Sequence, residues 1–181
     1  ADPLYTAAYT GVNGGLVVVV ADDPGMHSSQ NEQDTRFHAL AAHVPVLEPS
    51  DSAECAAFVR RAFEISEEYD TPVILRLTTR VAHARSMVEI GERAVIAKKP
   101  YRKDIMKYVM MPGMAKKRHL FVDERMEKLS LLSDKMIQLD QPGKKLGIIT
   151  SGISYQYVRE VFPDAAVLKL NMVHPLPAQA I

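Results

Sequence analysis

The sequence predicts an α/β fold, with part of a parallel sheet, a helical linker and the start of a second α/β unit. Short apolar runs rich in β-branched residues occupy residues 17–20, 44–47 and 72–77. Such unbroken runs are typical of strands that are covered on both faces of a parallel sheet. Segments whose apolar residues recur at helical spacing lie between these runs. A new alternation of strand, helix and strand begins at residue 145. Strand, helix and strand in this order imply a right-handed parallel crossover.

Residues 1–85 form the first predicted unit. Residues 3–9 are predicted to be the last turns of a helix, and residues 34–43 to be a helix between the first two strands. Asp51 and Glu54 resemble an acidic capping box, after which apolar residues follow at helical spacing. We therefore expect another helix between the second and third strands.

Residues 86–144 are predicted to be a linker between the two units. They contain prolines and no convincing strand pattern, and a long amphipathic helix is expected over residues 114–139. Residues 145–181 then begin the second unit, with strands expected at residues 145–150 and 166–170 on either side of a helix. The sequence thus predicts three regions along the chain.

Composition excludes several classes of protein. The 181 residues are 47% hydrophobic and 24% charged, which is typical of a globular protein. The longest apolar run, residues 16–21, is far shorter than the roughly 20 residues that cross a bilayer, so we expect a soluble protein without a membrane partner. Cys55 is the only cysteine, which excludes an internal disulfide or a cysteine-bound cluster and fits a reducing cytoplasm. The chain opens on Ala1 without methionine, and we interpret it as a piece of a longer protein.

The net charge of zero conceals a basic segment. Residues 97–118 hold eight Lys or Arg and one Asp, so the rest of the chain has a charge of minus seven. Such a segment could attract nucleic acid. Only Tyr101 and Tyr108 are nearby aromatics, and no nucleic-acid motif is present, which favours a solvated linker or a contact with another subunit.

A polar loop follows the first predicted strand, over residues 22–36. In open α/β sheets, ligands bind outside the carboxyl ends of the strands. Ser28, Ser29 and Gln33 offer hydrogen-bond donors and acceptors, and Arg36 could hold a carboxylate in a bidentate fork. The loop is therefore either a ligand site or a polar turn that caps the next helix.

Other reactive side chains have simpler explanations. Asp22 and Asp23 could bind a divalent cation, but neighbouring acidic residues point in different directions and a third ligand is missing, which favours strand-end solubility. His27 has no partner histidine, so hydrogen bonding is favoured over metal binding. Cys55 is expected on the apolar face of its helix as a small buried residue rather than a nucleophile. We therefore predict no metal site and no catalytic residue in the chain.

Three motifs together resemble one known family. The polar string over residues 22–36 contains HSSQNEQD, and two further motifs lie at residues 151–155 and 172–177. These segments resemble the α (large) subunit of indolepyruvate:ferredoxin oxidoreductases, and the resemblance extends over nearly the whole chain. It implies a thiamine-diphosphate enzyme that oxidatively decarboxylates indolepyruvate and other arylpyruvates to aryl-acetyl-coenzyme A, with ferredoxin as the electron acceptor.

The resemblance also implies a domain plan. Residues 1–85 would be the later half of the domain that binds the pyrimidine ring of the cofactor, and residues 145–181 the beginning of a transketolase-C-terminal-like domain. The full-length enzyme would carry thiamine diphosphate, Mg²⁺ and 4Fe-4S clusters and would work with a small β subunit. None of these cofactors is expected on this chain, because the glutamate that activates thiamine would lie upstream and Cys55 alone cannot bind a cluster. We therefore expect the chain by itself to be inactive, and to self-associate through exposed apolar edges.

For the site, the resemblance implies only the polar loop. Ser28, Ser29, Gln33 and Arg36 are the expected neighbours of cofactor or substrate, with Arg36 the candidate for the oxoacid carboxylate. Two alternatives stay open at this point. The enzyme could act on pyruvate or a branched-chain oxoacid, or the chain could be a non-catalytic scaffold whose basic linker binds RNA or a partner subunit.

Overall fold

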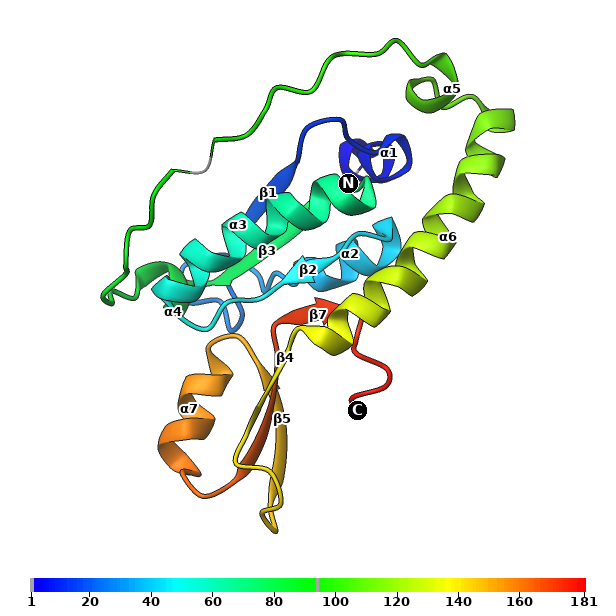
Figure 1. Cartoon of the computed structure of the whole chain (residues 1–181). Helices are drawn as coiled ribbons and strands as arrows, with labels where there is room; N and C mark the ends of the chain where they lie inside the picture. Colours follow the sequence, from blue (N-terminus) through cyan, green and yellow to red (C-terminus); the bar gives the residue numbers. More distant parts are fainter. Residues whose placement is uncertain (1, 94) are drawn as a thin grey trace.

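The structure is a computed structural model that describes residues 2–93 and 95–181. Its first unit is a four-stranded sheet in the order β1-β3-β2-β7 (Figure 1). The elements of this unit before the linker are α1 (Asp2–Thr10), β1 (Val17–Asp22), α2 (Thr35–Ala42), β2 (Val46–Leu47), α3 (Ser52–Tyr69), β3 (Val73–Thr78) and α4 (Thr79–His83). β3 pairs in parallel with both β1 and β2, which confirms the predicted parallel sheet.

Helices cover both faces of this sheet, as the unbroken apolar strands require. On one face Ala8 of α1 and Ala39 of α2 pack against Ile74. On the other face Ala62 of α3 and Leu129 of α6 (Pro112–Lys135) pack against Leu75. Because successive residues of a strand point to opposite faces, Ile74 and Leu75 belong to the two different cores.

The predicted helix starts are confirmed by their caps. The side chain of Asp34 accepts a hydrogen bond from the backbone of Arg36 at the start of α2. Asp51 accepts one from the backbone of Glu54 at the start of α3, at 2.9 Å. The carboxylate of Glu54 accepts in turn from the backbone of Ser50, at 2.8 Å. Each cap satisfies backbone donors that the first turn of a helix leaves free.

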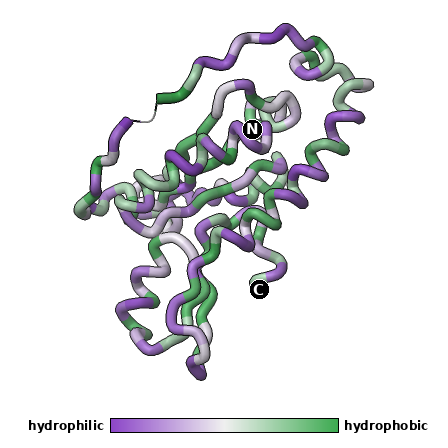
Figure 2. The backbone as a smooth tube through the Cα atoms, in the orientation of Figure 1, coloured by the Kyte–Doolittle hydropathy of each residue, from purple (hydrophilic) through white to green (hydrophobic). Residues whose placement is uncertain are grey.

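The linker crosses the molecule as an extended strap. We use strap for residues 84–93 and 95–104, which form no regular secondary structure and arch away from the sheet (Figure 1). Hydrophobic and hydrophilic residues alternate along it, whereas hydrophobic stretches gather in the strands of both sheets (Figure 2). The short helix α5 (Ile105–Tyr108) and then α6 bring the chain back. None of the described helices is long and apolar enough to span a bilayer.

The predicted end of the long helix was wrong. The helix was expected over residues 114–139, but α6 ends at Lys135 and Ile137–Asp140 forms strand β4. β4 pairs antiparallel with β6 (Ala166–Leu170), a partner nearly thirty positions further along the chain. Because that pairing is long-range, the local amphipathic pattern could not distinguish a last helical turn from a short strand.

The second sheet has the order β4-β6-β5 and carries one helix. β5 (Gly147–Ser151) and β6 are parallel, and α7 (Ser154–Val161) connects them, as expected for this region. After β6 the chain returns to the first sheet, where β7 (Met172–His174) pairs antiparallel with β2. Residues 145–181 therefore contribute strands to both sheets, and Met172 is buried in the core between α3 and α6.

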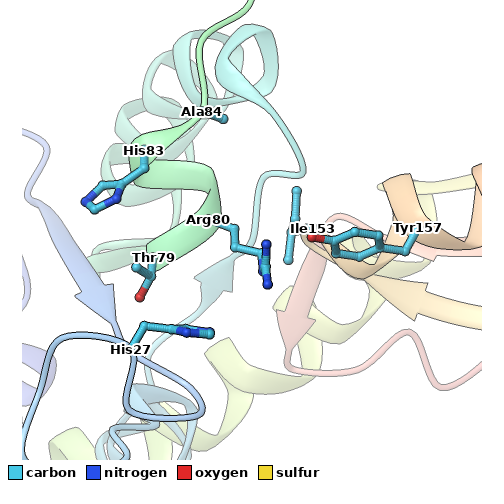
Figure 3. Close-up of a pocket in the computed structure, with 7 residues that line it drawn as sticks. All are labelled: His27, Thr79, Arg80, His83, Ala84, Ile153 and Tyr157. Atoms are coloured by element: carbon cyan, nitrogen blue, oxygen red, sulfur yellow. The ribbon is translucent and has the colours of Figure 1, made fainter.

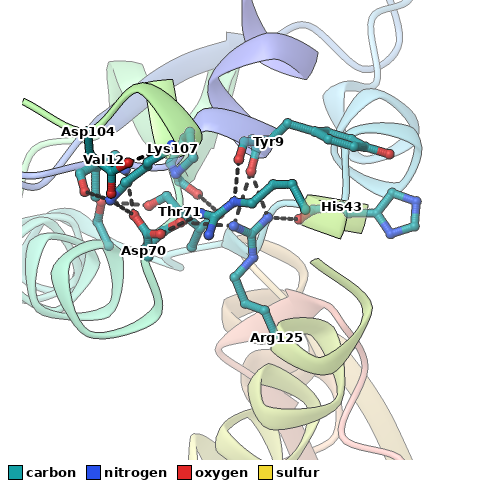
Figure 4. A network of polar contacts seen from close by, with 12 residues as sticks. Tyr9, Val12, His43, Asp70, Thr71, Asp104, Lys107 and Arg125 are labelled. Atoms are coloured by element: carbon teal, nitrogen blue, oxygen red, sulfur yellow. Dashed lines mark hydrogen bonds and ion pairs between the residues drawn. The ribbon is translucent and has the colours of Figure 1, made fainter. Parts of the chain in front are cut away.

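A buried arginine holds three helix ends together. Arg125 of α6 is 2% exposed, and its guanidinium donates to the carbonyl oxygens of Ala8, His43 and Asp70 at 2.9–3.2 Å (Figure 4). Ala8 lies in the last turn of α1, and the other two residues are the C-caps of α2 and α3. The carboxyl end of a helix carries partial negative charge, so three such ends stabilise the buried cation. Burial lowers the pKa of Arg125 to about 10, which leaves it protonated at neutral pH.

Candidate functional site

The carboxyl ends of β1 and β3 meet at one edge of the first sheet. The polar loop leaves β1 at Asp22 and leads into α2, and β3 continues directly into α4. The turn between β5 and α7 of the second unit reaches the same place, because Ser151 donates a hydrogen bond to Glu48 at 2.5 Å. We call this region the strand-end site, and it is where open α/β sheets bind ligands.

A charged cluster is buried beneath the strand-end site. Arg76, in the middle of β3, is 3% exposed and forms ion pairs with Asp22 and Glu48. Asp22 also accepts from the backbone of Thr35, at 2.7 Å, which ties the start of α2 to the end of β1. Buried charges need partners of this kind, because a single unpaired ion in the interior is strongly destabilising.

Sequence reasoning missed Arg76 and Glu48. The sequence did contain a sign of this cluster. Arg76 is the one charged residue in an otherwise apolar run, and Glu48 follows directly after the buried pair Val46 and Leu47. A charged residue inside a covered strand requires a nearby opposite charge. What the sequence did not reveal is which carboxylates would supply it.

The expectation that Asp22 and Asp23 favour solubility was wrong. Each is 4% exposed, and their carboxylates hold structure together instead of facing water. Asp23 accepts from the hydroxyl of Thr79 and from the backbone N–H groups of Ser28 and Ser29, at 2.5–2.7 Å. The Thr79 hydroxyl first, and then these backbone donors, hold the pKa of Asp23 well below its usual range. The loop is thereby fixed to the start of α4.

Three of the four predicted site residues lie in the fixed loop and Arg36 lies in the first turn of α2, and they contact different partners. Ser28 and Ser29 are bound to Asp23 through their backbone, and Ser28 also through its hydroxyl at 3.3 Å. The side-chain amide of Gln33 is exposed and donates only to Asn31, at 3.4 Å. The Arg36 guanidinium forms a bidentate pair with its neighbour Asp34, at 2.7 and 2.8 Å. These contacts order the loop, and of the four predicted residues Arg36 alone lines either of the two cavities described below.

Two cavities open at the strand-end site. The smaller, of about 180 Å³, is lined by Arg36, Arg76 and Glu48 together with the turn at Ser151 and Gly152. A Cβ at Gly152 would lie 3.1 Å from the Glu48 side chain, so glycine permits the close approach of the turn.

The larger cavity has a volume of about 470 Å³ and lies between the two units (Figure 3). It is lined by His27, Thr79, Arg80, His83, Ala84, Ile153 and Tyr157. The guanidinium of Arg80 lies 5.9 Å from the ring centre of Tyr157, so a side chain of each unit meets across the cavity. The sequence did not predict this cavity, because Tyr157 and Arg80 are brought together only by the docking of α7 against the first unit.

Polar contacts hold the second unit against the first. Lys169 of β6 is fully buried and pairs with Glu54 of α3, and its ammonium lies 4.6 Å from the ring centre of Tyr155. Gln156 of α7 donates to Ser50 at 3.2 Å. The two walls of the larger cavity are therefore positioned by buried contacts outside it.

The structure offers no metal centre among the residues that it describes. Across residues 2–93 and 95–181, no group of three or more His, Cys, Asp or Glu side chains is arranged to hold a metal ion. Cys55 lies partly buried on α3, and burial raises the pKa of its thiol. A raised pKa disfavours the thiolate, which is the nucleophilic and metal-binding form.

Comparison with known proteins identifies relatives along the whole chain, although no family model matches it. Curated proteins named indolepyruvate oxidoreductase subunit IorA are 44% identical in Methanothermobacter marburgensis, over 98% of this chain, and 43% identical in Pyrococcus abyssi, over 97%. The corresponding subunit of Archaeoglobus fulgidus is 39% identical over 100% of the chain. The chain spans only 29–30% of the length of these relatives.

A solved structure supports the fold. A 2-oxoglutarate:ferredoxin oxidoreductase from Magnetococcus marinus matches 98% of this chain with a TM-score of 0.67, at 16% identity and over 40% of that protein's chain. At this identity the likeness concerns the fold, and it confirms the predicted α/β class with parallel strands. Over nearly its whole length, the chain is therefore similar to a segment of the indolepyruvate oxidoreductase subunit IorA.

Proposed function

We propose that the chain is part of the large subunit of a 2-oxoacid:ferredoxin oxidoreductase that acts on indolepyruvate and related arylpyruvates. The observation that carries this proposal is the 39–44% identity to IorA subunits over 98–100% of the chain, a span that contains both units. The reaction would oxidatively decarboxylate the oxoacid, form an aryl-acetyl-coenzyme A and pass electrons to ferredoxin. We further propose a small partner subunit and a cytoplasmic location, the latter because the chain has one cysteine and so no internal disulfide to form.

The cofactors of such an enzyme do not fit on this chain alone. Activation of thiamine diphosphate requires a carboxylate that faces the pyrimidine ring, but Asp22, Asp23 and Glu48 at the strand ends are engaged by Arg76, Thr79 and other donors. A 4Fe-4S cluster needs several cysteines, and Cys55 is the only one. Among the described residues, no group of three or more His, Cys, Asp or Glu side chains could hold Mg²⁺ without further ligands. We therefore propose that the chain alone is inactive and supplies one wall of a site that other segments complete.

Within that wall, we propose that the polar loop neighbours the bound ligand. Ser28, Ser29 and Gln33 lie on the loop, and Arg36, in the first turn of α2, lines the smaller cavity. Residues 1–85 would correspond to the pyrimidine-binding domain, residues 86–144 to a linker and residues 145–181 to the start of a transketolase-C-terminal-like domain. The position of the loop at the carboxyl ends of parallel strands supports this arrangement.

The test uses the full-length subunit together with its small partner subunit, thiamine diphosphate, Mg²⁺, coenzyme A and an artificial electron acceptor. We expect reduction of the acceptor that depends on coenzyme A and is faster with indolepyruvate than with pyruvate, 2-oxoglutarate or a branched-chain oxoacid. A preference for one of the other oxoacids would change the proposed substrate class but would leave the proposed type of reaction unchanged. No reduction with any of the four oxoacids would contradict the proposal and favour a scaffold role for the basic linker.

A further inference from the structure

The larger strand-end cavity combines one arginine and two histidines with an aromatic wall (Figure 3). Arg80, His27 and His83 come from the first unit, whereas Ile153 and Tyr157 come from the second. Among the described residues that line it, none carries a carboxylate. Its volume of about 470 Å³ is in the range of small-molecule sites. These features suit a ligand that has both an anionic group and an apolar ring.

Arg80 differs from the other arginines of the strand-end site in its partners. The guanidinium of Arg36 is bound by Asp34, and that of Arg76 lies buried between two carboxylates. Within the described part of the chain, Arg80 forms no ion pair, and its contact is the face of the Tyr157 ring. Of these three arginines, Arg80 is therefore the one that can donate to a ligand carboxylate without breaking an existing ion pair.

We propose that the larger cavity binds the carboxylate of the arylpyruvate substrate on Arg80 and places its aromatic ring against Tyr157. Arg80 would then be an anion-binding residue, and Tyr157 would determine specificity for aromatic oxoacids. The identity of the substrate rests on the proposed function, whereas the affinity of the cavity for an aryl carboxylate does not.

The ring of Tyr157 is well placed to select aromatic ligands. Ile153 and Tyr157 are four residues apart at the start of α7 and therefore lie on the same side of the helix, facing the cavity. An offset or edge-on aromatic contact adds to the burial of apolar area. The second unit thus supplies the apolar half of the site and the first unit the charged half.

The kinetic test compares variants of the full-length enzyme with its partner subunit. Arg80→Gln is expected to raise the KM for indolepyruvate about 10-fold to 100-fold, the range of a lost charge-assisted hydrogen bond, with kcat changed much less. Tyr157→Leu is expected to raise the KM for indolepyruvate but not for pyruvate, and Tyr157→Phe to restore the parent value. Arg61→Gln on α3, where the guanidinium pairs with Glu64 and does not line the cavity, is the matched control for removing a guanidinium.

Two kinetic results would overturn the assignment. One is an Arg80→Gln enzyme with the parent KM for indolepyruvate. The other is a rise in KM that follows Arg36→Lys and not Arg80→Gln, which would return the carboxylate to the polar loop.

A binding test separates this proposal from the proposed function. The 181-residue chain is titrated with indole-3-propionate, which cannot be decarboxylated as a 2-oxoacid, while the imidazole NMR signals of His27 and His83 are followed. We expect both signals to shift in the parent and in Arg61→Gln, and neither to shift in Arg80→Gln. This result would support the cavity even if the full-length enzyme oxidised none of the oxoacids.

The same titration distinguishes an aryl carboxylate from other anionic ligands of Arg80. Inorganic phosphate and coenzyme A are anions that an arginine also binds, and both are added as competitors. We expect phosphate and coenzyme A to displace indole-3-propionate only weakly when each is added at a concentration at which indole-3-propionate itself saturates the cavity. Tighter binding of coenzyme A than of the aryl carboxylate, or no shift with any probe, would overturn the proposal.

Discussion

Arg76 shows how a single residue organises the strand-end site. It reaches from the middle of β3 to Asp22 at the end of β1 and to Glu48 after β2, so one guanidinium joins the ends of the two strands that flank β3. Glu48 in turn binds Ser151 of the second unit. Because each group is buried or nearly so, the orientation of the loop and of the turn depends on this cluster.

Removing Arg76 is expected to destabilise the chain strongly. Arg76→Met leaves two buried carboxylates without their cation, and we expect a loss of about 3–5 kcal/mol in the free energy of unfolding. Urea unfolding followed by circular dichroism measures this loss, with Arg61→Gln as the surface control at less than about 0.5 kcal/mol. Adding Glu48→Gln to Arg76→Met should recover part of the loss, since one unpaired charge is removed. Strictly additive losses would show that the cluster does not act as a unit.

Asp23 makes the stability of the loop depend on pH. Hydrogen bonds from Thr79 and from the backbone of Ser28 and Ser29 hold its pKa below the ordinary value near 3.8. A carboxyl group whose folded pKa is depressed contributes stability above its unfolded pKa, and that contribution is lost as pH falls toward the folded pKa. The pKa of Asp34 is lowered in the same direction, first by its hydrogen bond from Arg36.

We therefore expect stability to fall as pH drops below about 4, and to fall less steeply in Asp23→Asn. The variant should already be less stable than the parent at neutral pH, because an amide replaces a carboxylate that accepts several donors. Urea unfolding at a series of pH values between 7 and 2 measures both slopes. Parallel curves for parent and variant would show that Asp23 titrates normally in the folded chain.

At the scale of elements, buried and partly buried arginines attach α6 to the first unit. Arg125 binds the carboxyl ends of α1, α2 and α3, and Arg118 and Lys107 nearby bind Asp70 (Figure 4). The helix also contributes Leu129 to the core beneath the sheet. A substitution at Arg125 should therefore affect the packing of several helices together.

Arg125→Met is expected to lower the free energy of unfolding by at least about 2 kcal/mol, because carbonyls of three helix ends lose a buried donor. Arg125→Lys should also destabilise, since an ammonium cannot reproduce the fork that reaches all three ends. Thermal unfolding measures both, with Lys117→Gln on the exposed face of α6 as the control. An Arg125→Met chain as stable as the control would remove the proposed role of the helix ends.

Elements with a local signature were predicted, and those that depend on distant partners were not. The starts of α2 and α3 followed from Asp34 and Asp51, whose caps act within one turn. β4 was mistaken for the end of a helix because only its pairing with β6 makes it a strand. The two residues of the larger cavity that carry the further proposal, Arg80 and Tyr157, were missed for the same reason. The polar loop was found because its composition and its place after a strand are both visible in the sequence.

At the scale of the whole molecule, two surfaces lack partners within the described chain. The strap exposes Met87, Ile90 and Val95 almost completely, at 95–98% of their area. β1 is an edge strand of the first sheet, since its only strand neighbour in that sheet is β3. Exposed apolar residues and open edges favour association with another chain.

We therefore expect the 181-residue chain to self-associate in solution. Light scattering should give a mass above that of one chain, and replacing Met87, Ile90 and Val95 together with serine should reduce it. The control also replaces three exposed strap residues with serine, but charged ones: Lys98, Lys99 and Arg102. A parent chain that scatters as a clean monomer would contradict this expectation.

The ratio of kcat/KM for indolepyruvate to that for pyruvate should be determined on the full-length subunit with the proposed small partner subunit. We expect a ratio well above one that falls toward one in Tyr157→Leu, because this substitution removes the aromatic ring from the wall of the larger cavity. A ratio at or below one in the parent enzyme would contradict the assignment of this chain to an arylpyruvate-oxidising site.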